Sequence, residues 1–180
     1  MKKLLVAVLA LSTVSAFAQK SLITFGNFND AGDSSTFDVS NSGEDAGDTT
    51  TTNVMVNYTY AISESFMAGV TLGNHAEATS ASNYTTTGVQ FYYNLDGSVN
   101  DTCYVGLHYT MKNMATDDKT TTTALEYGHR FAVGSWKGFN LAFSPSISYA
   151  MATTDFDADG TDDLKTTSLA WNWIKFDVLF

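Results

Sequence analysis

The 180-residue chain has one cysteine, Cys103, and one proline, Pro145. A single cysteine excludes an internal disulfide, so no disulfide framework can hold this fold together. After the first residues no run of 18 apolar residues occurs, which excludes a transmembrane helix. The scarcity of proline, together with abundant Thr and Tyr, favours extended strands over helices.

Basic residues are also few, with nine against nineteen acidic ones. This negative balance argues against nucleic acid as a partner and against adsorption to an anionic lipid surface. Fourteen of the nineteen acids fall in four segments, which are residues 29–49, 75–83, 113–119 and 152–165. The sequence therefore predicts that the charge is concentrated in a few loops.

The N-terminus predicts an export signal. Lys2 and Lys3 precede an apolar run over residues 4–11, and Ala16 and Ala18 supply the small residues before a cleavage site. An uncleaved anchor is disfavoured, because about 15 apolar residues are fewer than the ~20 that a spanning helix needs. We expect a signal peptide over residues 1–18 and one domain over 19–180. Cleavage would leave seven basic residues against nineteen acidic ones, a net charge of −12.

Alternation of apolar with small or polar residues is the strongest pattern in the rest of the chain. It predicts eight strands, which are residues 21–28, 53–62, 66–73, 88–95, 103–112, 124–133, 139–151 and 166–180. The first and last are less regular. Trp171 and Trp173 fall on the face opposite to Phe180, so either a bulge shifts the phase or the two indoles fill the interior.

The predicted connections alternate between short turns, at 63–65, 96–101 and 134–138, and the four acidic segments, which are mostly longer. Short turns at one end, long loops at the other and aromatic residues near both ends are typical of bacterial outer-membrane barrels. A secreted β-sandwich would alternate too, but its water-facing side would carry more Lys and Glu than these small polar faces do. We predict an all-β fold, a transmembrane, antiparallel, up-and-down barrel of eight strands with short periplasmic turns and longer external loops. Pro145 should lie at a bulge or an unpaired position in the outer half of its strand.

The signal, the strand rhythm, the turn asymmetry and the terminal Phe180 together resemble the small eight-stranded outer-membrane barrels, the family of the outer membrane protein A transmembrane domain and outer membrane protein X. The resemblance covers residues 19–180. It implies location in the bacterial outer membrane, with outer-membrane lipid and lipopolysaccharide as surroundings. It also implies that the barrel-assembly machinery reads the last strand, through Ile174, Phe176, Val178 and Phe180.

Charged residues on the inward face point to an ion-pair cluster in the lumen, since an eight-stranded barrel is just wide enough for side chains to fill it. The predicted members are His108, Lys112, Glu126, Arg130, Lys175 and Asp177. Buried charges persist when they are paired. We expect Glu126 and Asp177 to pair with Arg130, Lys175 and, as a further candidate, Lys112. Such a cluster can be structural, or it can gate a narrow pore.

One segment resembles a calcium-binding loop, with acids at the first, third, fifth and ninth positions, namely Asp155, Asp157, Asp159 and Asp163. The twelfth position is Thr166 instead of Glu, so the match is incomplete. A solvated acidic loop is the main interpretation, with weak calcium or magnesium binding as the alternative. No other cofactor is expected.

Catalysis is not expected, because no spacing defines a nucleophile with its base. His129 is predicted to face lipid, and Cys103 to be a small apolar residue on the same surface. The predicted role is structural or surface interaction through the acidic loops. A narrow channel for small solutes or ions is the alternative, and a lipid-modifying enzyme a remote one. The oligomeric state is left open.

Overall fold

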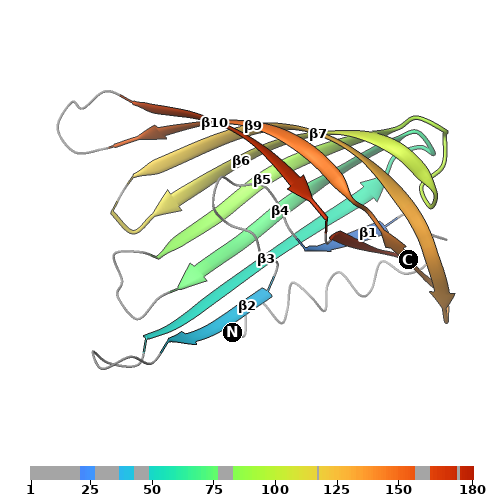
Figure 1. Ribbon diagram of the computed structural model, residues 1–180, viewed down its shortest axis with the longest axis horizontal. Coiled ribbons are helices and arrows are strands. Elements are labelled where there is room, and N and C mark those ends of the chain that lie inside the picture. The colour runs from blue at the N-terminus through green and yellow to red at the C-terminus, as the bar shows by residue number, and fades with distance from the viewer. Residues whose placement is uncertain are drawn as a thin grey trace.

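The computed structural model describes residues 21–26, 37–42, 49–76, 83–116, 118–156, 163–173 and 175–180. None of these residues forms a helix that is long and apolar enough to cross a membrane. They form strands joined by turns (Figure 1), with the bounds β1 (Ser21–Gly26), β2 (Phe37–Ser42), β3 (Thr49–Ala61), β4 (Phe66–Ala76), β5 (Tyr84–Asn94), β6 (Thr102–Met114), β7 (Lys119–Trp136), β8 (Phe139–Phe143), β9 (Ser146–Asp155), β10 (Leu164–Asn172) and β11 (Lys175–Leu179).

The sheet closes into a barrel through antiparallel pairs. At the end that carries the short turns, the order β8–β7–β6–β5–β4–β3–β1–β11 returns to β8, which makes a ring of eight strands. The closing pair joins the first strand to the last, with Leu22 opposite Leu179. Backbone hydrogen bonds of 2.9 Å in both directions between Ser21 and Phe180 extend this pair. The predicted all-β, eight-stranded, up-and-down barrel is confirmed.

Three of the eight strands are each described as two segments, so that eleven segments are distinguished. β1 and β2 both pair with β3, and β8 and β9 both pair with β7. β10 and β11 pair with β9 and β8 in turn. At the loop end the order is therefore β10–β9–β7–β6–β5–β4–β3–β2, and no pairing among the described residues joins β2 to β10.

Two predicted connections are corrected. The predicted loop over residues 29–49 contains β2, because Val39 and its neighbours pair with the threonine run at the start of β3. Threonine favours pleated, half-buried surfaces, so this run extends the sheet into a segment that its acids had suggested was loop. The predicted turn over 134–138 is narrower, because β7 continues to Trp136 and only Lys137 and Gly138 form the turn, with φ of 47° and 89°. Positive φ at both central residues suits a two-residue hairpin.

Pro145 lies between β8 and β9, outside both strands, as predicted for a residue that cannot donate to the ladder. The prediction that Pro145 lies in the outer half of its strand is wrong. Pro145 follows β8, which begins at the short turn and has 5 residues, whereas β9 beyond it has 10. The Pro145 carbonyl accepts a hydrogen bond from the backbone N–H of His129, 3.2 Å away. The backbone N–H of His129 on β7 therefore keeps a hydrogen-bond partner at this interruption.

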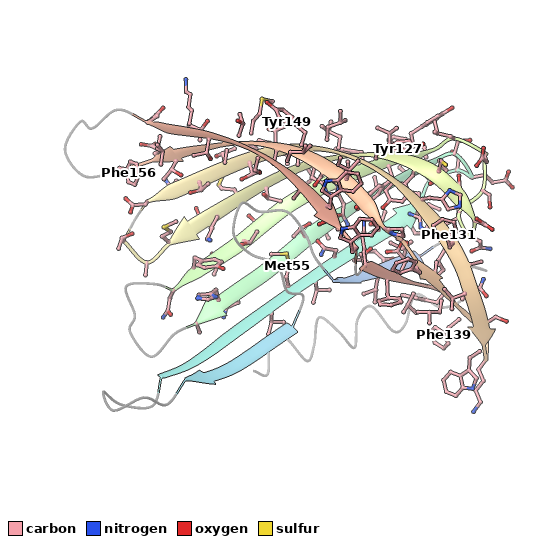
Figure 2. All side chains as sticks on the ribbon, viewed as in Figure 1. Met55, Tyr127, Phe131, Phe139, Tyr149 and Phe156 are labelled. Carbon is pink, nitrogen blue, oxygen red and sulfur yellow. The ribbon has the colours of Figure 1, made fainter. Side chains whose placement is uncertain are left out.

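The two faces of the sheet differ sharply. Large apolar side chains lie on the outside, including Tyr127, Phe131 and Tyr149, each about half exposed (Figure 2). The buried inward positions are mostly Thr, Ser, Asn and charged residues. Trp171 and Trp173 are 60% and 66% exposed, so the indoles do not fill the interior. Asn172 and Lys175 both face inward although they are three residues apart, so the bulge interpretation is confirmed.

Candidate functional site: an ion-pair network in the lumen

The lumen network is positioned by the alternation of β7 and β11. On β7 the side chains of Glu126 and Arg130 face inward, and on β11 those of Lys175 and Asp177 do. All four are buried, with no more than 3% of each residue exposed. These four predicted residues therefore meet inside the barrel as two carboxylates and two cations.

Glu126 is held by three donors. Its Oε1 accepts hydrogen bonds from Lys175 Nζ at 2.5 Å and from the Tyr104 hydroxyl at 3.0 Å. Its Oε2 lies 2.7 Å from His108 Nε2. Lys175 Nζ also lies 3.0 Å from the Tyr104 oxygen. Both oxygens of this β7 carboxylate thus have partners, which come from β6 and β11.

Asp177 joins further strands. Its Oδ2 accepts from Arg130 Nε at 2.9 Å and from Ser144 Oγ at 2.5 Å, and its Oδ1 accepts from Thr24 Oγ1 at 2.7 Å. Arg130 also donates through Nη1 to the Val99 carbonyl oxygen at 2.9 Å. One carboxylate thereby connects β1, β7, β11 and the residue after β8, where the barrel closes.

Two tyrosines fill the space around the charges. Tyr92 and Tyr104 are buried and pack edge to face, with ring centroids 5.5 Å apart. Lys175 Nζ lies 5.6 Å and 5.1 Å from these two centroids, and Arg130 Cζ lies 5.0 Å from that of Tyr104. Cations over aromatic faces gain additional stabilisation when water is excluded. The two rings and the two cations are therefore packed together inside the barrel.

Of the two remaining predicted members of the lumen network, one joins it and the other lies elsewhere. His108 joins the network through Glu126, and its ring packs edge to face on Tyr92 at 5.3 Å. Lys112 lies apart, towards the loop end of β6, with its Nζ 3.5 Å from the centroid of the Tyr84 ring. The structure therefore brings five of the six predicted residues together.

The predicted calcium loop falls partly outside the described residues, which include Asp155 and Asp163 but not Asp157 and Asp159. Both described aspartates are exposed. In the part of the chain that the structure describes, no group of three or more His, Cys, Asp or Glu residues could hold a metal ion. Weak binding of calcium or magnesium by this loop stays a prediction that calorimetry of the folded protein can test.

The predicted assembly signal lies on the outer face of β11. Phe176 is exposed and Val178 half-buried, while the Phe180 ring lies 6.0 Å from that of Phe139. Ile174 lies outside the described residues. Recognition of this strand by the assembly machinery stays a prediction.

Sequence reasoning missed Tyr92 and Tyr104 as members of the lumen network. A signal for them was present, because Tyr92 pairs with Gly106 and Tyr104 with Gly128 on the neighbouring strands. A Cβ at Gly106 would lie 2.8 Å from the Tyr92 ring, and one at Gly128 would lie 2.5 Å from the Tyr104 oxygen. An inward tyrosine opposite a glycine marks a ring that lies over its cross-strand neighbour.

No protein-family model matches this chain, and no curated protein matches it. Among solved structures the chain is similar to the outer membrane protein AlkL, determined by solid-state NMR in DMPC lipid bilayers. That similarity has a TM-score of 0.36 and 14% identity, and it covers 92% of this chain and 89% of the other. A TM-score this low carries no argument about function, so the assignment of the barrel rests on its strand pairings.

Proposed function

We propose that this protein is an integral outer-membrane β-barrel with a structural or surface-interaction role, whose lumen is closed by the ion-pair network and whose acidic loops face outside the cell. Its membership of the small eight-stranded barrel family belongs to the same proposal. The observation that carries the proposal is the inversion of polarity, with apolar side chains outside and a satisfied charge network inside.

The exterior supports a lipid environment. A protein in water rarely leaves contiguous large apolar side chains exposed over a whole sheet. In hydrocarbon, by contrast, a closed sheet satisfies its backbone groups and needs an apolar exterior. Strands β5, β6 and β7, with 11, 13 and 18 residues, reach or exceed the ~9–11 residues that a tilted strand needs to cross the bilayer core.

The interior supports a structural role over conduction. Glu126 and Asp177 are matched by Lys175 and Arg130, and all four are buried. A conducting pore would need a polar path past these charges, but Tyr92 and Tyr104 occupy the space beside them. The arrangement therefore favours a closed lumen over a conducting pore.

Planar-bilayer recording tests this closure. We expect no discrete conductance steps from the wild type at high protein loading. Steps in the wild type that are lost or altered in Glu126→Ala or Arg130→Ala would favour the channel and overturn the structural role. A separate comparison tests the enzyme alternative. If lipid A is acylated identically in cells with and without the protein, the hypothesis that the protein modifies lipid A is rejected.

Labelling within the bilayer tests the exterior. Cysteines placed at Gln90 and Phe91 in a Cys103→Ala background differ in side-chain direction, since Gln90 is buried and Phe91 is 40% exposed. We expect a lipid-soluble quencher to reach a probe at residue 91 and to spare one at residue 90. The reverse order would contradict a membrane-embedded barrel.

A further inference from the structure

Three chemically reactive side chains meet on the outer surface of the barrel, where the neighbouring side chains are apolar. Cys103 on β6 and His129 on β7 are directly opposite cross-strand partners. Cys103 Sγ lies 3.0 Å from His129 Nδ1, and His129 Nε2 lies 3.0 Å from Asp101 Oδ1. The three form a continuous thiol–imidazole–carboxylate chain that the lumen network does not use.

The chain runs from water towards lipid. Asp101 belongs to the turn before β6, and its side chain is 65% exposed, whereas that of His129 is 31% exposed. Cys103 is half-buried and is the first outward residue of β6. The His129 ring packs on Phe131, with centroids 4.0 Å apart. In the proposed membrane-embedded barrel, the thiol lies towards the short-turn end of the outer surface, which is the side nearer to one layer of lipid headgroups and esters.

An apolar groove lies beside the imidazole on the same surface. It has a volume of about 190 Å³, and its lining includes Tyr127, His129, Pro145, Ile147, Trp171 and Trp173. The two indoles stack with centroids 5.7 Å apart, at 12° between their planes. A groove of this composition fits part of an acyl chain whose ester end lies near the thiol.

The geometry favours a nucleophilic relay over a metal site. Asp101 contacts Nε2 and Cys103 contacts Nδ1, so an ion between the thiol and the imidazole would not include the carboxylate. A base that contacts the nucleophile on one side and an orienting group on the other is the arrangement that activates thiols and hydroxyls in acyl transfer.

We propose that Cys103 is a nucleophilic thiol that accepts an acyl group from a glycerophospholipid of the surrounding leaflet and is thereby S-acylated. This inference rests on the proposed function, because a phospholipid is at hand only if the barrel lies in a membrane. The phospholipid is preferred to lipopolysaccharide because the thiol lies at the short-turn end, which the barrel proposal places on the periplasmic side.

The atoms balance without an oxidant or a reductant. His129 Nδ1 takes the thiol proton while its Nε2–H donates to Asp101, and the sulfur attacks the ester carbonyl carbon. The new S–C bond forms, the ester C–O bond breaks, and the leaving glycerol oxygen takes the proton from His129. The products are a thioester on Cys103 and a lysophospholipid.

The test uses the chain from residue 19 onwards, refolded into phosphatidylethanolamine and phosphatidylcholine vesicles with isotope-labelled acyl chains. We expect the intact mass to rise by one acyl chain, with the label released by neutral hydroxylamine and one lysophospholipid formed per chain. Cys103→Ala should form no adduct. His129→Gln should lower the rate by about 100-fold, since general-base assistance is worth ~10²–10⁴.

A matched control moves the thiol along the same face. Val105→Cys in a Cys103→Ala background places a cysteine at the next outward position of β6, opposite Tyr127 instead of His129. We expect no thioester there. An equal rate of acylation at residue 105 would overturn the role of His129. If the label is transferred only when lipid A is the labelled donor in the vesicles, the phospholipid assignment is overturned.

Failure of this inference can be distinguished from failure of the barrel proposal. Insertion is measured in the same samples by gel migration before and after boiling. If the wild-type protein inserts but carries no thioester, the acylation proposal is overturned and the barrel proposal stands. If His129→Gln does not fold, the pH dependence of alkylation by a membrane-permeant maleimide replaces it. Cys103 should react faster near neutral pH than the cysteine at residue 105, and equal rates would contradict an activated thiol.

Discussion

Glu126 is the residue on which the lumen charges converge. Removing a carboxylate from water costs several kcal/mol, and this cost is offset only when both oxygens have good partners. Lys175, Tyr104 and His108 supply those partners. The network is therefore stable as a unit, and the loss of one member leaves another charge buried without its counterion.

Glu126→Ala is predicted to lower the free energy of unfolding by about 3–5 kcal/mol, because Lys175 would stay buried without its carboxylate. Urea unfolding of the protein in lipid vesicles, followed by tryptophan fluorescence, measures the change. Glu64→Ala is the matched control, since Glu64 lies exposed in the β3–β4 turn and should change stability by less than about 0.5 kcal/mol. Equal effects of the two variants would contradict a stabilising lumen network.

Replacing both charges of the pair should be far milder. In Glu126→Gln with Lys175→Met, no unpaired charge remains, and buried ion pairs replaced by neutral groups of similar size are often neutral for stability. We predict that the double variant recovers most of the loss caused by Glu126→Ala. A double variant that is no more stable than Glu126→Ala would show that the hydrogen bonds, and not the balance of charge, hold the network.

Gly128→Ala is predicted to destabilise the barrel by about 1–3 kcal/mol, because the added methyl group would overlap the Tyr104 ring and force the network apart. The nearest atoms would lie at 2.5 Å and 2.6 Å on Tyr104 and at 2.8 Å on Ser146. Gly134→Ala, on the same strand, has no atom within 4 Å of the new Cβ and serves as the control. Urea unfolding in lipid vesicles measures the stability of both variants. Equal stabilities of Gly128→Ala and Gly134→Ala would contradict the close packing of Tyr104.

At the level of the elements, β11 combines closure of the barrel with the predicted assembly signal. Its inward residues bind Glu126 and contact Arg130, while the aromatic ring of Phe176 lies exposed on the outer face. Because β1 covers its other edge, the last strand completes the sheet. Sequence identified both faces of this strand, since alternation over residues 175–180 has one phase.

Phe180→Ala is predicted to reduce the amount of folded protein in outer membranes of cells severalfold while leaving refolding into vesicles nearly unchanged. The reason is that the terminal aromatic is predicted to be read by the assembly machinery, which refolding into vesicles does not use. Phe139→Ala removes the same ring contact without touching the terminus, and should leave cellular assembly near wild type. An equal loss in both variants would assign the effect to packing.

At the level of the whole molecule, Asp177 ties together strands that are far apart in sequence. Its partner Thr24 is 153 positions away, and Arg130 and Ser144 come from two further parts of the sheet. The backbone pairs of β1 with β11 close the ring at the same place. Opening the barrel therefore requires the loss of side-chain and backbone contacts together.

Asp177→Asn is predicted to lower the temperature at which the compact form converts to the slower-migrating unfolded band on gels. A loss on the order of 3–5 kcal/mol corresponds to a shift on the order of 10 °C for a chain of this length. Asp118→Asn is the control, because the Asp118 carboxylate accepts a hydrogen bond from Thr116, which is only two positions away in the sequence. A shift of equal size in both would contradict the role of Asp177 in closure.

The sequence by itself determined the fold class and the identity of most lumen charges, because side chains in a strand alternate with a period of two and the phase can be read locally. The structure alone decided the partners, since pairing depends on register between strands that are distant in sequence. That is why β2 lay within a predicted loop, and why Lys112 was grouped with the lumen charges although its ammonium lies over the Tyr84 ring. It is also why Cys103, His129 and Asp101 became a connected chain only when β6 and β7 were placed side by side.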